Sequence, residues 1–256
     1  MPAEIVCTNA SMAFHASGGP VHALDGVSLD VERGELVSLI GPSGCGKSTL
    51  LRLIADVLQP TGGAIEVRGG PPARARLARE LGFVFQHPGL LLWRDALANV
   101  SLPLEVGGWG RRHVAPHRPE ELLELVGLKG FEHAYPRQLS GGMQQRVSIA
   151  RALVTGPPIL LMDEPFGALD EITRDHLNQE LLRIWAATGT TIIFVTHSIP
   201  EAVYLSNRIF VFTPRPGRVR EEVRIDLPSP RDPAIKDTPA FVGHAAALRR
   251  ALAQAA

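Results

Sequence analysis

One glycine-rich stretch limits what this chain can fold into more than any other feature of the sequence. It follows an apolar run at residues 36–40 and precedes a second apolar run at residues 50–54. That order predicts a buried strand, a tight turn and a helix, which is the setting that a phosphate-binding loop requires. The stretch fills every position of that motif, in the order Gly41, Pro42, Ser43, Gly44, Cys45, Gly46, Lys47, Ser48 and Thr49.

The residue types in this loop suit the binding of a nucleotide. Glycines at 41, 44 and 46 allow the backbone to curl until successive N–H groups point into one hollow, where the helix that begins near Lys47 adds its positive dipole end. Lys47 is expected to reach the terminal phosphates, and the Ser48 hydroxyl to hold Mg²⁺. The alternative is a glycine-rich turn beside an unrelated Lys-Ser pair, but it does not explain why every position is filled. We therefore predict a nucleotide site.

The composition narrows the class of protein. A chain of 256 residues is long enough for one large α/β domain, and its 26 Lys and Arg balance its 26 Asp and Glu, so no net charge draws it onto nucleic acid. Two cysteines, Cys7 and Cys45, do not suggest a disulfide framework and are typical of a reducing compartment. The beginning of the chain lacks the pattern of a secretory signal, and the apolar runs have the length of strands. We expect a soluble protein without a nucleic-acid partner.

Two adjacent acids follow the apolar, strand-like run at residues 159–162. We predict that Asp163 binds Mg²⁺, mostly through water, and that Glu164 orients or deprotonates the attacking water. The alternative is a polar strand end that enters a turn, which would leave the phosphate loop without a partner for hydrolysis.

Gln86 and His197 also stand just past strand-like runs, at residues 81–85 and 191–195. Ligands of open α/β sheets bind beyond the carboxyl ends of the strands, so both side chains are candidates for contact with a phosphate or a metal ion. From the residues alone the alternatives stay open: a surface glutamine before a proline turn, and a histidine with a structural role.

Phe14 and a serine-glycine-glycine stretch carry less distinctive patterns. Phe14 is expected in a first loop, where an exposed ring could stack on adenine, although its spacing fits a place in the core slightly better. Ser140 is a favourable N-cap, and Gly141 and Gly142 leave the first N–H groups of the following helix bare, which attracts phosphate. An ordinary capped and buried helix explains the same three residues.

These features occur in one fixed order, which is the phosphate loop, Gln86, residues 139–146, the acids at 163–164, residues 168–170 and His197. The ordered set resembles the ATPase subunit of an ABC transporter over nearly the whole chain, up to about residue 226. The resemblance implies an α/β fold of the P-loop NTPase class with a mixed β-sheet core and an antiparallel β subdomain.

The resemblance also implies a domain organisation. The ABC ATPase domain would occupy residues 1–226, with a helical subdomain inserted at about residues 87–156. Residues 227–256 would form a C-terminal linker and a helical tail.

Within one subunit, the resemblance implies half of an ATP site. Residues 41–49 bind the phosphates, and Ser48, Gln86 and Asp163 hold Mg²⁺. Phe14 matches the aromatic position that stacks on adenine, which is usually tyrosine.

The same resemblance implies that a second copy completes the site in a head-to-tail dimer. Ser140, Gly141 and Gly142 contact the γ-phosphate that is bound by the other subunit. Glu164 is the catalytic base, His197 is the switch residue, and Asp170 belongs to the loop that joins the two sites.

A finer resemblance comes from residues 85–94, 98–100, 165–170 and 215–218, which are similar to importer ATPases of the nitrate, sulfonate and taurine type. It implies integral membrane permease subunits as partners, a solute-binding protein as an indirect partner, and a peripheral place at the cytoplasmic face of the membrane. The chain departs from the pattern at Leu92, where proline is common, at Asp56, where glycine is usual, and at Ser198, where an acid is common. The solute stays open among nitrate, sulfonates, taurine and thiamine-precursor pyrimidines.

The alternative from a different class is an ABC ATPase that acts on DNA or ribosomes. Such proteins tend to have coiled-coil insertions, tandem ATPase domains or a basic surface, and this sequence has none of these patterns. A small-molecule P-loop kinase does not account for residues 140–142 or for His197. We therefore favour the energy-coupling ATPase of a bacterial importer, which uses ATP and Mg²⁺.

Overall fold

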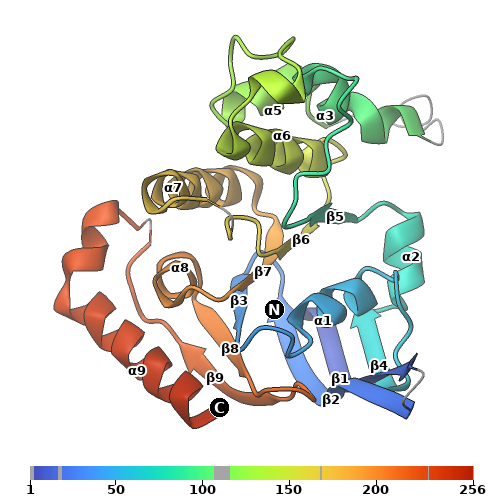
Figure 1. The fold of residues 1–256 in the computed structure, drawn as a ribbon, viewed down its shortest axis with the longest axis vertical. Helices are drawn as coiled ribbons and strands as arrows, with labels where there is room; N and C mark the ends of the chain where they lie inside the picture. Colours follow the sequence, from blue (N-terminus) through green and yellow to red (C-terminus); the bar gives the residue numbers. More distant parts are fainter. Residues whose placement is uncertain (1–2, 17–18, 107–115, 168, 230, 256) are drawn as a thin grey trace.

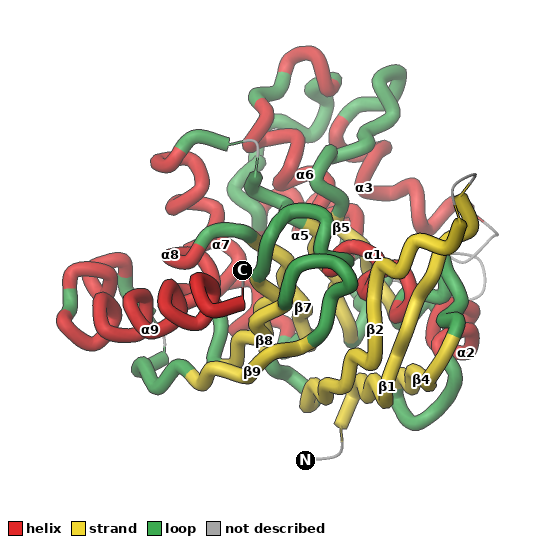
Figure 2. The backbone as a smooth tube through the Cα atoms, turned by 60° about the horizontal axis from the view of Figure 1, so that its bottom comes forward, coloured by secondary structure: helices red, strands yellow, loops and turns green. Residues whose placement is uncertain are grey.

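Two β-sheets form the frame of the protein, as a computed structural model that describes residues 3–16, 19–106, 116–167, 169–229 and 231–255 shows (Figures 1 and 2). Within these ranges, a six-stranded sheet has the order β5-β6-β7-β3-β8-β9, and a three-stranded sheet has the order β2-β1-β4. The smaller sheet is antiparallel, whereas the larger sheet is parallel except for β9. The strands are β1 (Ala3–Ala16), β2 (Gly19–Glu32), β3 (Leu36–Ile40), β4 (Gly62–Val67), β5 (Leu81–Val84), β6 (Ile159–Asp163), β7 (Thr191–Thr196), β8 (Arg208–Phe212) and β9 (Val219–Arg224).

The helices surround the sheets in three groups (Figure 1). One group contacts the smaller sheet and consists of α1 (Lys47–Ile54) and α2 (Pro72–Leu77). A second group lies between β5 and β6 in the chain and packs together at the top of Figure 1, with α3 (Ala96–Glu105), α5 (Pro119–Leu125), η2 (Pro136–Gln138) and α6 (Gly141–Leu153). The third comprises α7 (Glu171–Thr188), α8 (Ile199–Leu205), η3 (Pro233–Asp237) and α9 (Pro239–Ala255). No helix in the described ranges is both long enough and apolar enough to span a bilayer.

The core consists of two apolar clusters, one on each face of the larger sheet. Every residue of β3, β6, β7 and β8 is buried, which is why these strands read as nearly continuous apolar runs in the sequence. Alternate residues of β3 divide between the two clusters. Leu36 and Ile40 belong to the cluster that also contains residues of α6, α7, α8 and α9. Val37 and Leu39 belong to the cluster that contains residues of α1. Each strand is therefore held from both faces, so its register is strongly determined.

Parallel register brings the ends of three strands to one edge of the sheet. Ile40, at the end of β3, pairs with Thr196 at the end of β7. Asp163, at the end of β6, pairs with Val195. The phosphate loop, the acids at 163–164 and His197 follow these three neighbouring ends, so they lie close together.

The N-terminal strands are longer than the sequence pattern indicates. Both β1 and β2 have 14 residues, and β1 contains Phe14, which pairs with Val21. The prediction that Phe14 lies in a loop is therefore wrong. Register shifts between Cys7 and Ala13 interrupt the alternation of apolar and polar residues, which explains why the pattern did not reveal one continuous strand.

The C-terminal stretch packs closely on the rest of the protein. Phe241 and Leu248 of α9 are buried in the same apolar cluster as the helices of the third group. Arg231 is also buried, and its Nη1 donates to the carbonyl oxygens of Tyr204 and Ser206 at 2.8 and 3.0 Å. Burial lowers the pKa of Arg231 to about 10. Buried hydrogen bonds of Arg231 therefore hold the stretch that was expected to be a linker before the helical tail.

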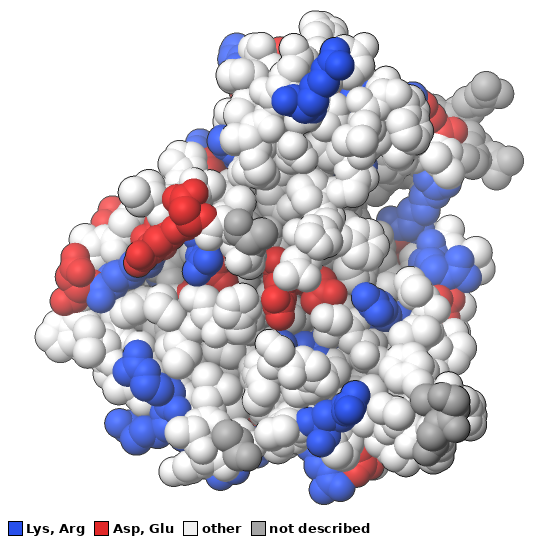
Figure 3. Space-filling model, viewed as in Figure 1, with Lys and Arg blue, Asp and Glu red and all other residues white. Residues whose placement is uncertain are grey.

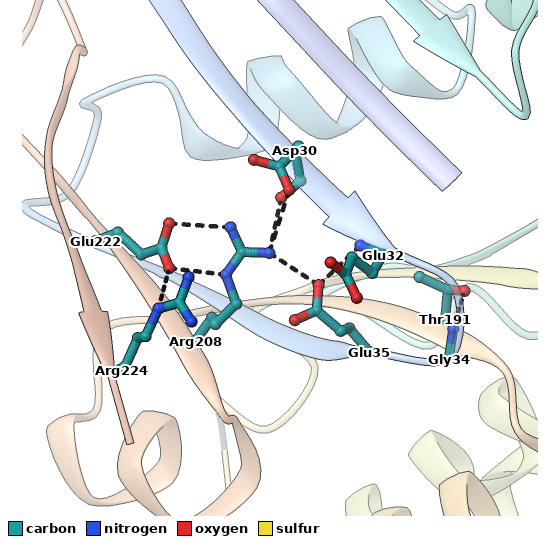
Figure 4. A network of polar contacts seen from close by, with 8 residues as sticks. All are labelled: Asp30, Glu32, Gly34, Glu35, Thr191, Arg208, Glu222 and Arg224. Carbon is teal, nitrogen blue, oxygen red and sulfur yellow. Dashed lines mark hydrogen bonds and ion pairs between the residues drawn. The ribbon is translucent and has the colours of Figure 1, made fainter. Parts of the chain in front are cut away.

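Arg208, the first residue of β8, ties three segments together (Figure 4). Its guanidinium donates to both carboxylate oxygens of Glu222 on β9, at 2.8 and 2.9 Å. It also donates to Glu35 at 3.0 Å and lies 3.4 Å from Asp30 of β2. The hydrogen bonds from Arg208 hold the pKa of Glu222 below its usual value. Only 10% of the Arg208 side chain is exposed, so this network is better shielded from water than an ordinary surface ion pair.

Replacing Arg208 with alanine should lower the free energy of unfolding by about 2 kcal/mol, because several charge-assisted hydrogen bonds are lost from a largely buried position. The matched control is Arg224→Ala, since Arg224 contacts the same Glu222 at 3.2 Å but has 81% of its side chain exposed. That control should change stability by less than about 0.5 kcal/mol. Urea unfolding of the three proteins measures both effects, and equal losses would contradict the special role of Arg208.

The Arg208 effect should depend on pH in one direction. Because the folded-state pKa of Glu222 lies below its usual value of 4.5, its contribution is fully present above that value and is lost as the pH falls through the lower, folded-state pKa. The stability difference between the wild type and Arg208→Ala should therefore shrink in acid.

Candidate functional site

The phosphate loop has the backbone shape that its glycines predict. Gly44 and Gly46 have left-handed φ values of 74° and 103°, and Gly46 is the N-cap of α1. A Cβ atom at Gly46 would lie 2.6 Å from Leu24 Cδ2, so this close approach excludes a larger residue. The first N–H groups of α1 have no acceptor within the helix, and they form the positive end of its dipole. The side chain of Cys45 is buried beneath the loop in the core, so any contribution from this residue to binding comes from its backbone.

The ammonium group of Lys47 lies inside the loop. Its Nζ donates to the carbonyl oxygens of Gly41 and Pro42 at 2.8 and 2.9 Å, and the residue is only 4% exposed. A buried ammonium group needs such acceptors, since an unpaired buried charge is costly. The lysine is thus fixed where the loop curls, beside the N-terminus of α1.

Asp163 has the environment of a carboxylate that can accept a cation. Ser48 Oγ donates to Asp163 Oδ1 at 2.6 Å, and Asp163 is 8% exposed. Burial raises the pKa of Asp163, an effect that the Ser48 hydrogen bond opposes and the nearby Glu164 charge reinforces. In the described ranges Asp163 forms no ion pair with a basic side chain, and no group of three or more His, Cys, Asp or Glu forms a metal cluster there. A hydroxyl beside a carboxylate fits Mg²⁺, which prefers oxygen ligands and keeps several waters.

Glu164 and His197 form a pair next to these groups. The Nδ1 of His197 lies 3.4 Å from Glu164 Oε2, and about half of the histidine side chain is exposed. Glu164 has a left-handed φ of 45°, while its N–H donates to the carbonyl oxygen of Val195 at 3.0 Å. Pairing with β7 therefore holds Glu164 in a conformation that is unfavourable for a residue with a side chain, as is common at functional sites.

A hollow of about 220 Å³ lies over the phosphate loop. It is lined by residues 44–49, by Glu164 and by Phe14, whose side chain is 38% exposed and therefore is not part of the core. The hollow is smaller than the roughly 300–1,000 Å³ of pockets that enclose a ligand. One subunit thus provides an open, partial site. A larger hollow elsewhere on the protein contains neither the phosphate loop nor the acids.

Three residues of this hollow were not predicted as site residues: Val21, Ala23 and Arg215, although Arg215 belongs to a stretch that carried the finer resemblance. Arg215 precedes Gly217, whose N–H donates to the carbonyl oxygen of Ala23 at 3.0 Å. A Cβ atom at Gly217 would lie 1.9 Å from the Cys45 carbonyl oxygen, so the segment at 215–217 packs directly on the phosphate loop. The arginine, proline and glycine at 215–217 were visible in the sequence, but no local pattern indicates contact with a loop about 170 residues away.

The remaining predicted residues lie apart from this hollow. Gln86 is exposed just beyond β5, and its side chain does not line the hollow. Ser140 caps α6 by accepting from the Met143 N–H at 3.3 Å. Gly141 and Gly142 pack against the start of α7, where a Cβ atom at Gly142 would lie 2.8 Å from Thr173 Cγ2. Asp170 caps α7 in the same region by accepting from the Thr173 N–H at 3.0 Å, and the neighbouring Ala168 lies outside the described residues.

The two departures at Asp56 and Ser198 have local explanations. Asp56 follows α1 with a left-handed φ of 56°, a conformation that favours glycine. Its carboxylate is instead held by Arg76 at 2.7 Å, and this hydrogen bond lowers the pKa of Asp56. Ser198 caps α8 by accepting from the Glu201 N–H at 3.4 Å.

Comparison with known proteins identifies the class. The family described as "ABC transporter" matches residues 24–167, which is more than half of the chain. The chain therefore belongs to the ABC transporter family and is an ATPase of that family.

Individual relatives agree with this assignment. The chain is 46% identical to a taurine import ATP-binding protein of Jannaschia sp., over 85% of this chain and 80% of the relative. It is 43% identical to an aliphatic sulfonates import ATP-binding protein of Bacillus cereus, over 86% of each chain. Among solved structures, it resembles an ATP-binding cassette in a dimeric, post-hydrolysis state bound to ADP and Pi, with a TM-score of 0.73 and 34% identity over 87% of this chain and 99% of the other. The predicted fold class and ATPase activity are confirmed, while the roles of the individual site residues stay predictions.

Gly217→Ala should weaken ATP binding by about tenfold, equivalent to about 1.4 kcal/mol, because the added methyl group forces the phosphate loop away from residues 215–217. Gly243→Ala is the matched control, since no atom lies within 4 Å of a Cβ atom built there. Titration with a fluorescent ATP analogue measures the affinity, and thermal unfolding confirms that both variants fold. Wild-type affinity in a folded Gly217→Ala protein would contradict this account of the loop.

Proposed function

We propose that this chain is the ATP-hydrolysing, energy-coupling subunit of a bacterial importer. The observation that carries the proposal is the convergence of two polar pairs, Ser48 with Asp163 and Glu164 with His197, beside the hollow over the phosphate loop. One pair suits a metal ion and the other suits the activation of water, so together they provide what phosphoryl transfer to water requires.

In this proposal, each residue of the half-site has one task. The N–H groups of residues 44–49 and the Lys47 ammonium bind the phosphates, and Phe14 stacks on the base. Ser48, Asp163 and Gln86 would hold Mg²⁺, which when bound balances the charges of the phosphates and the buried carboxylate. Glu164 accepts the proton of the attacking water, and His197 orients Glu164 and contacts the γ-phosphate.

A second copy of the chain completes the site. The open hollow would leave part of the triphosphate exposed, and residues 140–142 of the same subunit do not line it. The bare start of α6 from a second copy, packed head to tail, supplies further N–H donors for the γ-phosphate. ATP thereby joins two subunits, and its hydrolysis releases them. The solved relative described as a dimer with ADP and Pi supports this arrangement.

The permease partner would dock on a groove of about 580 Å³ that residues of α1, α2, β5, α3 and α6 line. Val57, Phe85 and Val106 expose 65%, 50% and 56% of their surface there, which is unusual for such apolar residues. Arg79 closes one end by donating to the carbonyl oxygens of Pro103 and Val106, at 2.7 and 2.6 Å. Docking would place the chain at the cytoplasmic face of the membrane, where a solute-binding protein acts only through the permease. Residues 1–226 would be the ATPase domain, with residues 87–156 as the helical subdomain that carries part of the groove.

The names of the relatives support a proposal for the solute class. The two import proteins described above are named for taurine and for aliphatic sulfonates, so we propose a small sulfonate such as taurine, with nitrate as a second candidate of the same subfamily. The alternative of action on DNA or ribosomes has no comparable support. Figure 3 shows Lys and Arg side chains dispersed among acids on this face, rather than gathered in one basic stripe.

Glu164→Gln should lower the ATPase rate by about 10²-fold or more, since the amide cannot accept a proton from water. ATP binding should persist, because the phosphate loop is unchanged, and the protein should accumulate as an ATP-bound dimer. Phosphate release and size-exclusion chromatography measure the two effects. A variant that stays monomeric and still hydrolyses ATP would reject the assignment of Glu164.

Val57→Asp should prevent co-purification with the integral membrane permease that we propose as the partner, because it places a charge in the apolar groove. ATP hydrolysis by the isolated protein should remain unchanged, since Val57 lies outside the nucleotide hollow. Leu77→Asp is the matched control: Leu77 is 73% exposed on the neighbouring α2 but does not line the groove. Loss of the permease in both variants, or in neither, would contradict the proposed surface.

A further inference from the structure

The residue that precedes His197 forms a polar contact with α8. Thr196 is the last residue of β7, and its hydroxyl donates to Glu201 Oε2 on α8. The Ser198 N–H in turn donates to the Thr196 hydroxyl at 2.9 Å. Glu201 is 6% exposed, and its other oxygen, Oε1, lies 3.6 Å from Arg174 Nε. The carboxylate of Glu201 is therefore fixed to the backbone segment that carries His197.

A second contact holds the loop that precedes α7. Arg174 Nη2 donates to the carbonyl oxygen of Leu169 at 2.8 Å, and the Arg174 N–H donates to that of Asp170 at 3.0 Å. This loop borders the catalytic pair, since a Cβ atom at Gly167 would lie 3.7 Å from both Glu164 Oε2 and His197 Cε1. The position of Arg174 thus sets the position of a loop that touches the two side chains proposed to act on water.

Arg174 and Glu201, which form these two contacts, also form an incomplete ion pair with each other. Arg174 Nε lies 3.6 Å from Glu201 Oε1, and within the described residues both atoms are buried without a hydrogen-bond partner. A charge-assisted hydrogen bond between such groups is about 2.7–2.9 Å long. Buried charged atoms that lack a hydrogen bond are costly, so a small approach of the two elements would be favourable.

Space for that approach is present. A hollow of about 360 Å³ borders Arg174 and Glu201 and is also lined by Ser198 and by Lys236 of the C-terminal stretch. The guanidinium can therefore shift without displacing core side chains.

We propose that Glu201 and Arg174 are positioning residues, which join the segment carrying His197 to the loop before α7 and complete their hydrogen bond when two ATP-bound subunits close. Closure then adjusts His197 against Glu164 through this contact. The inference rests on the proposed function of the site, because it assigns these residues a part in ATP hydrolysis by the dimer.

The test compares the steady-state ATPase activity of Glu201→Gln, Arg174→Gln and the double variant with that of the wild type. Each single variant should lower kcat by about tenfold, a typical size for coupling between elements, while the KM for ATP stays within about twofold. The double variant should be no slower than either single variant, because both remove the same contact. If the two residues had only a structural role, the variants would instead unfold at a lower temperature, and their changes in kcat and KM would follow no common pattern.

Arg183→Gln is the matched control. Arg183 lies on the same helix and pairs with Glu180 at 2.9 Å, but 68% of its side chain is exposed and it lies outside this contact. Its kcat should equal that of the wild type. If Glu201→Gln does not fold, Thr196→Val and Thr196→Ser decide the question, because only serine keeps the hydroxyl that donates to Glu201. Valine should lower kcat by about tenfold and serine should not.

Full kcat in folded Glu201→Gln, or a double variant whose losses multiply, would overturn the inference. A wild-type protein that fails to hydrolyse ATP with Mg²⁺ present would instead refute the proposed function, so the two failures can be told apart.

Discussion

The register of three neighbouring parallel strands is the constraint on which the rest of the structure depends. Because Ile40 pairs with Thr196 and Asp163 pairs with Val195, strands β3, β7 and β6 end at the same level. A shift by one residue in any of them would turn its alternate side chains to the other face and misplace the residues that follow. The two apolar clusters prevent such a shift, since residues of β3 are committed to both of them. The packing of the core and the geometry of the site therefore depend on the same strand register.

The electrostatics of the half-site explain why nucleotide and dimer belong together. Lys47 Nζ donates to two carbonyl oxygens and to Cys45 Sγ, and Asp163 is buried with a hydroxyl as its partner and a second acid beside it. In the proposed function, a phosphate with its metal ion would balance the charges of Lys47 and Asp163 at once. The open hollow would then leave the remaining phosphate charge for donors from a second copy.

The sequence predicts those parts of the site that are contiguous. Residues 41–49, the acids at 163–164 and the cap at Ser140 depend on local backbone geometry, so spacing and residue type were enough. The part of the hollow that Ala23 and Arg215 line was not predictable, because it results from contact between segments that are far apart in the chain. Phe14 was misplaced in a loop because bulges in β1 disrupt the alternation of apolar residues. The firm attachment of the C-terminal stretch depends on the buried Arg231, whose charge would ordinarily indicate a surface residue.

In the proposed dimer, the first turn of α7 is the place where closure would reach Glu164 and His197. A Cβ atom at Gly142 would lie 2.8 Å from Thr173 Cγ2, so the start of α6 rests directly on this turn. The same turn is capped by Asp170 and continues into Arg174, which faces the buried Glu201. In the proposed dimer, a γ-phosphate that attracts the start of α6 from the opposite subunit would therefore displace α7 as well, since close packing transmits displacement rather than absorbing it. The start of α6, which would bind one ATP site, and the segment of His197, which would belong to the other site, would then share one rigid support, and this gives the two ATP sites a physical reason to act together.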